Sequence, residues 1–152
     1  TLLSVSSILS SFLTKFIMCP GVSLYMWGAE RLAVYEEVSP RVSFCTFEKL
    51  AYNTWLRIAG SVLEDSDDDN CLNGPCDQKL YVFQHACCHD FLDLTCFSGF
   101  VEVVGMKSGD NTIAAVAVLS LPGPLDLLLF EETVTMCTNR CLEHIFKPRS
   151  VS

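Results

Sequence analysis

Half of the residues in this chain are apolar, yet no apolar run is long enough to cross a membrane. A membrane-spanning helix needs about 20 nearly uninterrupted apolar residues. The first 19 residues are interrupted by five serines, by Thr14 and by Lys15, and the apolar run at residues 113–121 is far too short. We therefore expect no transmembrane segment, so the apolar side chains must be buried in a folded core or against a partner.

The apolar content is larger than one small core requires. The chain has 152 residues, of which 18% are charged, and its mean hydropathy is +0.35. A chain of this length suits one compact domain. We therefore predict a single α+β domain over residues 1–152, with part of its apolar surface covered by a protein partner or by self-association.

The charge of the chain is strongly negative. It holds 18 acidic and 10 basic residues, which gives a formal net charge of -8. A protein that binds nucleic acid through its phosphates needs clustered Lys and Arg side chains, and the basic residues here are scattered. The sequence therefore predicts no general nucleic-acid binding.

Much of the negative charge lies in one short stretch, where Glu64 and four aspartates surround Ser66. Neighbouring like charges repel one another and favour an exposed loop, so we predict an acidic loop at residues 64–78. This loop either contacts a basic partner or only keeps an apolar protein in solution, and phosphorylation of Ser66 would add to its charge. The candidate contacts are Asp67, Asp68 and Asp69.

Apolar periodicity separates candidate helices from candidate strands. Apolar side chains recur at the three- and four-residue spacing typical of helices in residues 2–16, 47–63 and 132–146. Runs of β-branched and aromatic residues predict strands at residues 22–27, 31–38, 41–46, 79–86, 100–106, 112–121 and 125–130. The expected fold class is α+β, a mainly antiparallel sheet with N-terminal, central and C-terminal helices packed on it.

The first of these helices is apolar on more than one face. A helix that docks only on its own core needs a single apolar face, so we expect the second face to contact a partner. The alternative is that the helix is buried on all sides by its own domain. The candidate interaction residues are Leu2, Leu9, Phe12 and Phe16.

The nine cysteines bear on the cellular compartment. An odd number cannot pair fully within one chain, and several of them stand in apolar stretches, where a free thiol behaves as a small apolar side chain. We therefore expect mostly reduced cysteines and a cytoplasmic or nuclear location.

Cysteine and histidine residues are concentrated between residues 71 and 96. Thiolates and imidazoles are ligands that zinc prefers, so this cluster is a candidate structural zinc site. Its spacing matches no recognised zinc motif, and buried free thiols are the alternative interpretation. The candidate ligands are Cys71, Cys76, His85, Cys88 and His89.

The sequence contains none of the common glycine-rich nucleotide-binding motifs and no Gly-x-Ser-x-Gly motif. A thiol nucleophile needs a neighbouring base, and adjacency of Cys and His in the sequence is weak evidence for one. We predict a non-catalytic protein–protein interaction module, an obligate subunit of a homo- or hetero-oligomeric complex, without a cofactor. The alternative is a small zinc-stabilised or Cys-dependent enzyme domain centred on residues 71–96.

Overall fold

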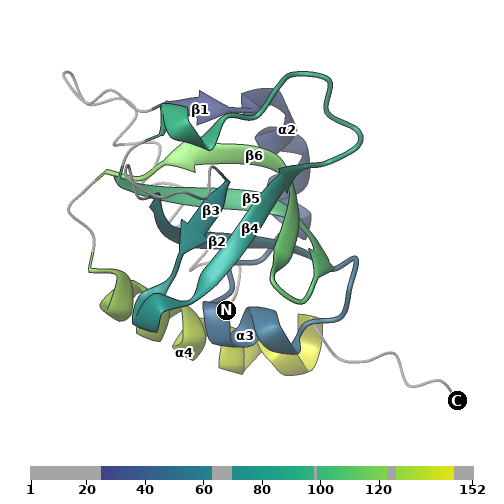
Figure 1. Cartoon of the computed structure of the whole chain (residues 1–152). Coiled ribbons are helices and arrows are strands. Elements are labelled where there is room, and N and C mark those ends of the chain that lie inside the picture. Colours follow the sequence, from purple (N-terminus) through teal and green to yellow (C-terminus); the bar gives the residue numbers. More distant parts are fainter. Residues whose placement is uncertain (1–24, 63–69, 98, 123–125, 146–152) are drawn as a thin grey trace, which may run out of the picture.

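The computed structural model describes residues 25–62, 70–97, 99–122 and 126–145 of the chain. These residues form a barrel of strands with helices α3 and α4 beneath it and α2 beside it (Figure 1). The strands are β1 (Met26–Trp27), β2 (Trp55–Val62), β3 (Cys71–Asn73), β4 (Lys79–Gln84), β5 (Gly99–Gly109) and β6 (Thr112–Ser120). The helices are α2 (Ala29–Tyr35), α3 (Phe44–Lys49) and α4 (Leu127–Ile145), with short 3-10 helices η1 (Glu36–Val38), η2 (Pro75–Asp77) and η3 (Leu94–Cys96).

Five of the strands close into a barrel. β5 pairs antiparallel with both β2 and β6, and β3 lies between β2 and β4, again with antiparallel pairing. β4 then runs parallel to β6, and this pairing closes the barrel. β1 pairs with the end of β6, after the residues of β6 that pair with β4.

Alternation along each strand fills the barrel with apolar side chains. In a strand, successive side chains point to opposite faces. Leu56 and Ile58 of β2 are fully buried and pair with Gly105 and Val103 of β5, so this face points inward. The same buried cluster includes Leu72, Leu80, Val82, Val101 and Ile113 from the strands and Phe44 and Phe47 from α3.

Helix α3 is held at both of its ends. At its start, the Ser43 side chain accepts a hydrogen bond from the Thr46 amide. At its end, the ammonium group of Lys107 donates to the carbonyl oxygens of Phe47, Glu48 and Leu50 over 2.7, 3.3 and 2.9 Å. A cation at the carbonyl end of a helix pairs with groups that have no partner in the helix itself. Lys107 therefore joins α3 to β5.

The edge of β2 that β3 does not reach is covered by a different segment. β3 pairs with β2 only at Ser61 and Asn73. Nearer the start of β2, the Arg57 amide donates to the Pro40 carbonyl and the Val42 amide donates to the Arg57 carbonyl, both over 2.9 Å. The segment before α3 thus completes the hydrogen bonding of β2.

A buried ion pair lies against the same region. The Arg41 Nε atom is 2.9 Å from the Glu102 Oε2 atom, and the two side chains are 9% and 2% exposed. The neighbouring guanidinium of Arg57 donates from Nε to the Ser39 carbonyl oxygen over 2.6 Å. Glu102 is therefore a buried anion beside the guanidinium groups of Arg41 and Arg57.

Much of the predicted architecture is confirmed. The class is α+β, the strand at residues 79–86 is β4, the hairpin at residues 100–106 and 112–121 is β5 with β6, and the C-terminal helix is α4. The pairing is mainly antiparallel, as predicted, and the one parallel pair among the described strands, β4 with β6, closes the sheet into a barrel. The predicted N-terminal helix lies outside the described residues.

The predicted central helix at residues 47–63 is wrong. Helix α3 ends at Lys49, and β2 occupies residues 55–62. Leu56 and Ile58 alternate with Arg57 and Ala59, and the pairing of β2 with β5 fixes this two-residue period. The few apolar residues at helical spacing fit a strand equally well.

Three predicted strands are also wrong. Residues 31–38 lie in α2 and η1, because Gly28 adopts a left-handed conformation (φ 77°) that ends β1 and begins a helix. Residues 41–46 form only an isolated bridge before α3 begins, and α4 starts at Leu127, within the strand predicted at residues 125–130.

Among the helices described, none has the length and apolarity that a membrane span requires.

Candidate interaction surfaces

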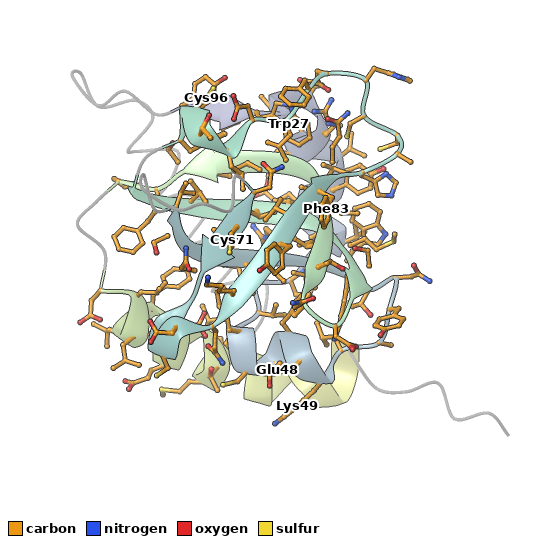
Figure 2. All side chains as sticks on the ribbon, in the orientation of Figure 1. Trp27, Glu48, Lys49, Cys71, Phe83 and Cys96 are labelled. Atoms are coloured by element: carbon orange, nitrogen blue, oxygen red, sulfur yellow. The ribbon has the colours of Figure 1, made fainter. Side chains whose placement is uncertain are left out.

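The outer face of β4 carries a cation and two aromatic rings. Leu80 and Val82 point into the barrel, so Lys79, Tyr81 and Phe83 point outward. Lys79 is exposed, Tyr81 is partly exposed and Phe83 is 54% exposed. Figure 2 shows Phe83 on the outside of the barrel.

A row of apolar side chains continues from Phe83 around the barrel. Phe83 of β4 pairs with Ala114 of β6, Ala114 pairs with Met106 of β5, and Met106 pairs with Trp55 of β2. Directly paired residues point to the same face of a sheet, and all four are at least partly exposed. We call these four residues the outer row.

Two further aromatic rings extend the outer row at Trp55. The Tyr35 ring from the end of α2 stacks on the indole, with centroids 4.4 Å apart and planes inclined by 22°. The imidazole of His85, directly after β4, lies 5.6 Å from the same indole. Both rings are partly exposed. Segments distant in the sequence therefore build one aromatic surface.

Helix α4 presents a second apolar surface. Its Val134 and Glu131 side chains are buried against the body of the domain. Its Leu128, Leu129 and Met136 side chains are exposed. Positions 129 and 136 are seven residues apart and share one face of the helix. We call these three exposed residues the outer face of α4.

Glu131 fixes α4 to the barrel. Its carboxylate Oε2 atom accepts a hydrogen bond of 2.9 Å from the Phe44 amide at the start of α3. Burial raises the pKa of this carboxyl to about 6, against the opposing effect of that hydrogen bond. The carboxyl thus retains its proton to a higher pH in the folded protein than in the unfolded chain, whose ordinary value is 4.5.

We expect the stability of the domain to fall as the pH rises from 4.5 to 6, because the folded protein holds the Glu131 proton more tightly than the unfolded chain does. A Glu131→Gln variant keeps a hydrogen-bond acceptor without the charge and should be more stable than the native protein at pH 7.5, by about 1 to 2 kcal/mol. The gain should vanish below pH 4.5. Urea denaturation at several pH values measures both, and a variant less stable at pH 7.5 would contradict the argument.

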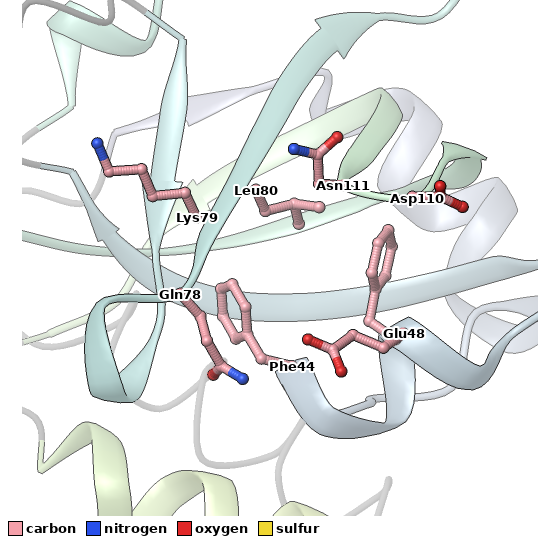
Figure 3. A pocket seen from close by; sticks show the side chains of 8 residues that line it. Phe44, Glu48, Gln78, Lys79, Leu80, Asp110 and Asn111 are labelled. Carbon is pink, nitrogen blue, oxygen red and sulfur yellow. The ribbon is translucent and has the colours of Figure 1, made fainter.

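The pocket in Figure 3 has the wrong chemistry for a phosphate. It has a volume of about 110 Å³ and lies between α3, the start of β4 and the turn between β5 and β6. Phe44, Phe47 and Leu80 supply its apolar lining, and the carboxylates of Glu48 and Asp110 outnumber the single ammonium group of Lys79. A pocket this small, with more negative than positive charge, disfavours a nucleotide.

The structure distributes the five predicted zinc ligands over separate elements. Cys71 is buried on β3 and Cys76 is exposed in the turn η2, whereas His85, Cys88 and His89 follow β4. Within the described ranges, no three His, Cys, Asp or Glu side chains are placed to hold one metal ion. The zinc site therefore stays a prediction.

Cys87 and Cys88 come together because the chain turns after β4. The Cys88 amide donates to the His85 carbonyl over 3.0 Å, and the two sulfur atoms are 3.8 Å apart. In a continued strand the two side chains would point to opposite faces. Burial raises the pKa of the Cys88 thiol to about 11, so this thiol is protonated at neutral pH.

The predicted interaction residues cannot be placed. Leu2, Leu9, Phe12 and Phe16, and the three aspartates at positions 67 to 69, all lie outside the described residues. The residues of the outer row and of the outer face of α4 were not among the sequence candidates. The alternation of Lys79, Tyr81 and Phe83 with buried residues was the one local signal that could have identified part of this surface.

Comparison with protein-family models finds no match for this sequence. Comparison with curated proteins likewise finds none. Among solved structures, a chain of U. maydis replication protein A bound to ssDNA matches with a TM-score of 0.53 and 20% identity, over 72% of this chain and 96% of that chain.

Two other solved chains match at lower TM-scores. The telomere capping protein Ten1 from Saccharomyces pombe gives 0.49, at 12% identity over 66% of this chain and 98% of its own. A chain of the S. pombe Stn1–Ten1 complex gives a TM-score of 0.47 at 13% identity, over 68% of this chain and 93% of its own length.

The shared fold is the OB fold, a five-stranded Greek-key barrel. This comparison contradicts the prediction of no general nucleic-acid binding, because the matching chain belongs to a protein solved with ssDNA. The prediction was based on the number and spacing of basic residues. Such a count does not register a surface on which aromatic rings stack with bases.

Proposed function

We propose that this chain is a non-catalytic OB-fold subunit of a complex that binds single-stranded nucleic acid. The observation that carries the proposal is the outward line of Lys79, Tyr81 and Phe83 on β4. OB folds bind oligonucleotides across the second and third strands of the barrel, which are β3 and β4 here. Aromatic rings on such a face stack with bases of any sequence, and a lysine contacts the phosphates.

The negative charge of the chain favours a subunit that adds to the nucleic-acid binding of a complex over a chain that binds nucleic acid tightly by itself. The net charge is -8, and Asp110 in the turn between β5 and β6 stands beside the start of β4. Phosphates are repelled by this background, so binding has to depend mainly on base stacking. We therefore propose weak binding by the isolated chain and tighter binding by the assembled complex, where contacts on other subunits add to it.

The outer face of α4 is the surface we propose for the protein partner. Leu128, Leu129 and Met136 would be covered by an apolar helix of another subunit or of a second copy. A nuclear or cytoplasmic location is part of the proposal, since Cys45, Cys76, Cys87, Cys88 and Cys96 are free thiols.

The nucleic-acid part of the proposal is tested with a fluorescent 30-nucleotide oligo(dT). We expect saturable binding by anisotropy at low salt, weakened about tenfold by Phe83→Ala and by Tyr81→Ala, since one stacked base contributes about 1 to 3 kcal/mol. Phe91→Ala is the matched control, because this phenylalanine is 82% exposed and lies outside the β4 line. Absence of binding, or equal losses in all three variants, would refute the assignment.

The partner surface is tested by light scattering of the purified chain at about 50 μM, a concentration at which exposed apolar surface drives association. We expect the native chain to associate and a Leu129→Lys, Met136→Lys double variant to be monomeric. Val34→Lys, which changes an exposed apolar residue on α2, should leave association unchanged. A native chain that stays monomeric would exclude α4 as a self-association surface, and association retained in the double variant would place the contact elsewhere.

A further inference from the structure

We infer that the bound single strand crosses the barrel along the outer row, from Phe83 on β4 to Trp55 on β2. This inference rests on the proposed function and specifies the path of the ligand. It places a main nucleic-acid contact on β6, β5 and β2, the strands reached from β4 in the direction away from β3. Trp55 and Met106 thereby become nucleic-acid contacts.

The register of the strands builds the path. Phe83, Ala114, Met106 and Trp55 are joined by direct pairings across four adjacent strands. Neighbouring strands lie about 4.8 Å apart, so the row measures roughly 14 Å around the curved surface of the barrel from β4 to β2. Stacked bases are about 3.4 Å apart. The row is therefore long enough for a short run of bases.

The far end of the row is already arranged for stacking. Tyr35 and Trp55 form a stacked ring pair, and His85 lies 5.6 Å from the indole. Tyr35 comes from α2, which is anchored to β6 because the Arg31 Nε atom donates to the Val116 carbonyl over 2.7 Å. Ring pairs held in this way need little ordering when a base joins them.

The charged side chains of the protein distinguish the two directions that the bound nucleic acid could take from Phe83. Toward β3, Asp77 is exposed in the turn before β4. Along the outer row, no side chain is charged. Phosphates are therefore repelled less on the side of β6, β5 and β2.

Two carboxylates that are close in sequence to the rings of Tyr35 and His85 are paired with arginines. The Glu36 Oε1 atom lies 3.8 Å from the Arg57 Nη1 atom, and the Asp90 Oδ1 atom lies 2.9 Å from the Arg31 Nη1 atom. Glu37 is exposed on η1. A path that contacts few cations also predicts that binding weakens little as salt is raised, because few counterions are released.

The test uses the two tryptophans of the chain. In a Trp27→Phe variant, Trp55 is the only tryptophan, and oligo(dT) should quench its emission by a third or more, saturating together with the anisotropy signal. In the matched Trp55→Phe variant, the emission of Trp27 should stay unchanged, because Trp27 is buried beneath Arg31. Trp55→Ala should weaken binding about tenfold.

A second variant keeps the test independent of the tryptophan substitutions. Met106→Glu places a carboxylate in the middle of the outer row and should weaken binding at least fivefold, whereas Val38→Glu, at an exposed position on η1, should not. Binding that persists with unquenched Trp55 and an unaffected Met106→Glu variant would overturn this path while leaving the proposed function standing. No binding by any variant or by the native chain would overturn both.

Discussion

Replacing Lys107 with Met should lower the free energy of unfolding by about 3 kcal/mol, because the Leu50 carbonyl loses the ammonium group and the Phe47 carbonyl keeps only its bond from the Leu50 amide. The Lys107 side chain is 2% exposed, and its ammonium group is the hydrogen-bond donor to three carbonyl oxygens at the end of α3. Met fills a similar volume without a donor, so the loss reports the hydrogen bonds more than the packing.

The measurement is urea denaturation followed by tryptophan fluorescence. Lys49→Met is the matched control, since Lys49 is exposed at the end of the same helix and should change the stability by less than about 0.5 kcal/mol. If both variants unfold at the same urea concentration, the carbonyl contacts of Lys107 contribute nothing and the account of α3 is wrong.

Replacing Glu102 with Ala should cost about 3 to 5 kcal/mol, as is typical when one member of a buried ion pair is removed. Arg41 loses its partner at 2.9 Å, and Arg57 loses a nearby opposite charge. The guanidinium groups of Arg41 and Arg57 then repel each other with less negative charge nearby. Desolvation already lowers the pKa of Arg57, which shows how costly a charge is at this place.

Thermal and urea unfolding of Glu102→Ala are compared with those of Glu132→Ala, an exposed position on α4. A second comparison separates the stranded charge from lost packing: adding Arg41→Met to Glu102→Ala removes one unpaired cation and should restore part of the loss. A double variant that is less stable than the sum of both single losses would contradict the ion-pair explanation.

The elements that the sequence predicted are those with a local signature. The hairpin of β5 and β6 flanks turn-forming residues, and α4 repeats apolar residues at helical spacing. β2 was missed because Trp55, Ile58 and Val62 fit a helix as well as a strand, and only its pairing with β5 decides between them. α2 was missed because its start depends on the left-handed conformation of Gly28.

The candidate site was harder to predict than the fold, for a physical reason. The outer row exists only because Trp55 pairs with Met106 and Phe83 pairs with Ala114, residues that lie far apart in the sequence. No periodic pattern within one segment of the sequence indicates which residues pair across the strands. Composition even pointed away from the proposed function, since negative charge excludes phosphate-driven binding but leaves stacking open.

The pairing of β6 with strands made much earlier in the chain also determines when the chain can fold during its synthesis. β6 is the last of the described strands, and β1, β4 and β5 all pair with it. From Met26 to its partner Leu119, a ribosome needs about 5 to 20 seconds at common elongation rates. For that time the nascent chain carries unpaired strand edges and apolar side chains, so we expect it to depend on chaperones until the last strand has emerged.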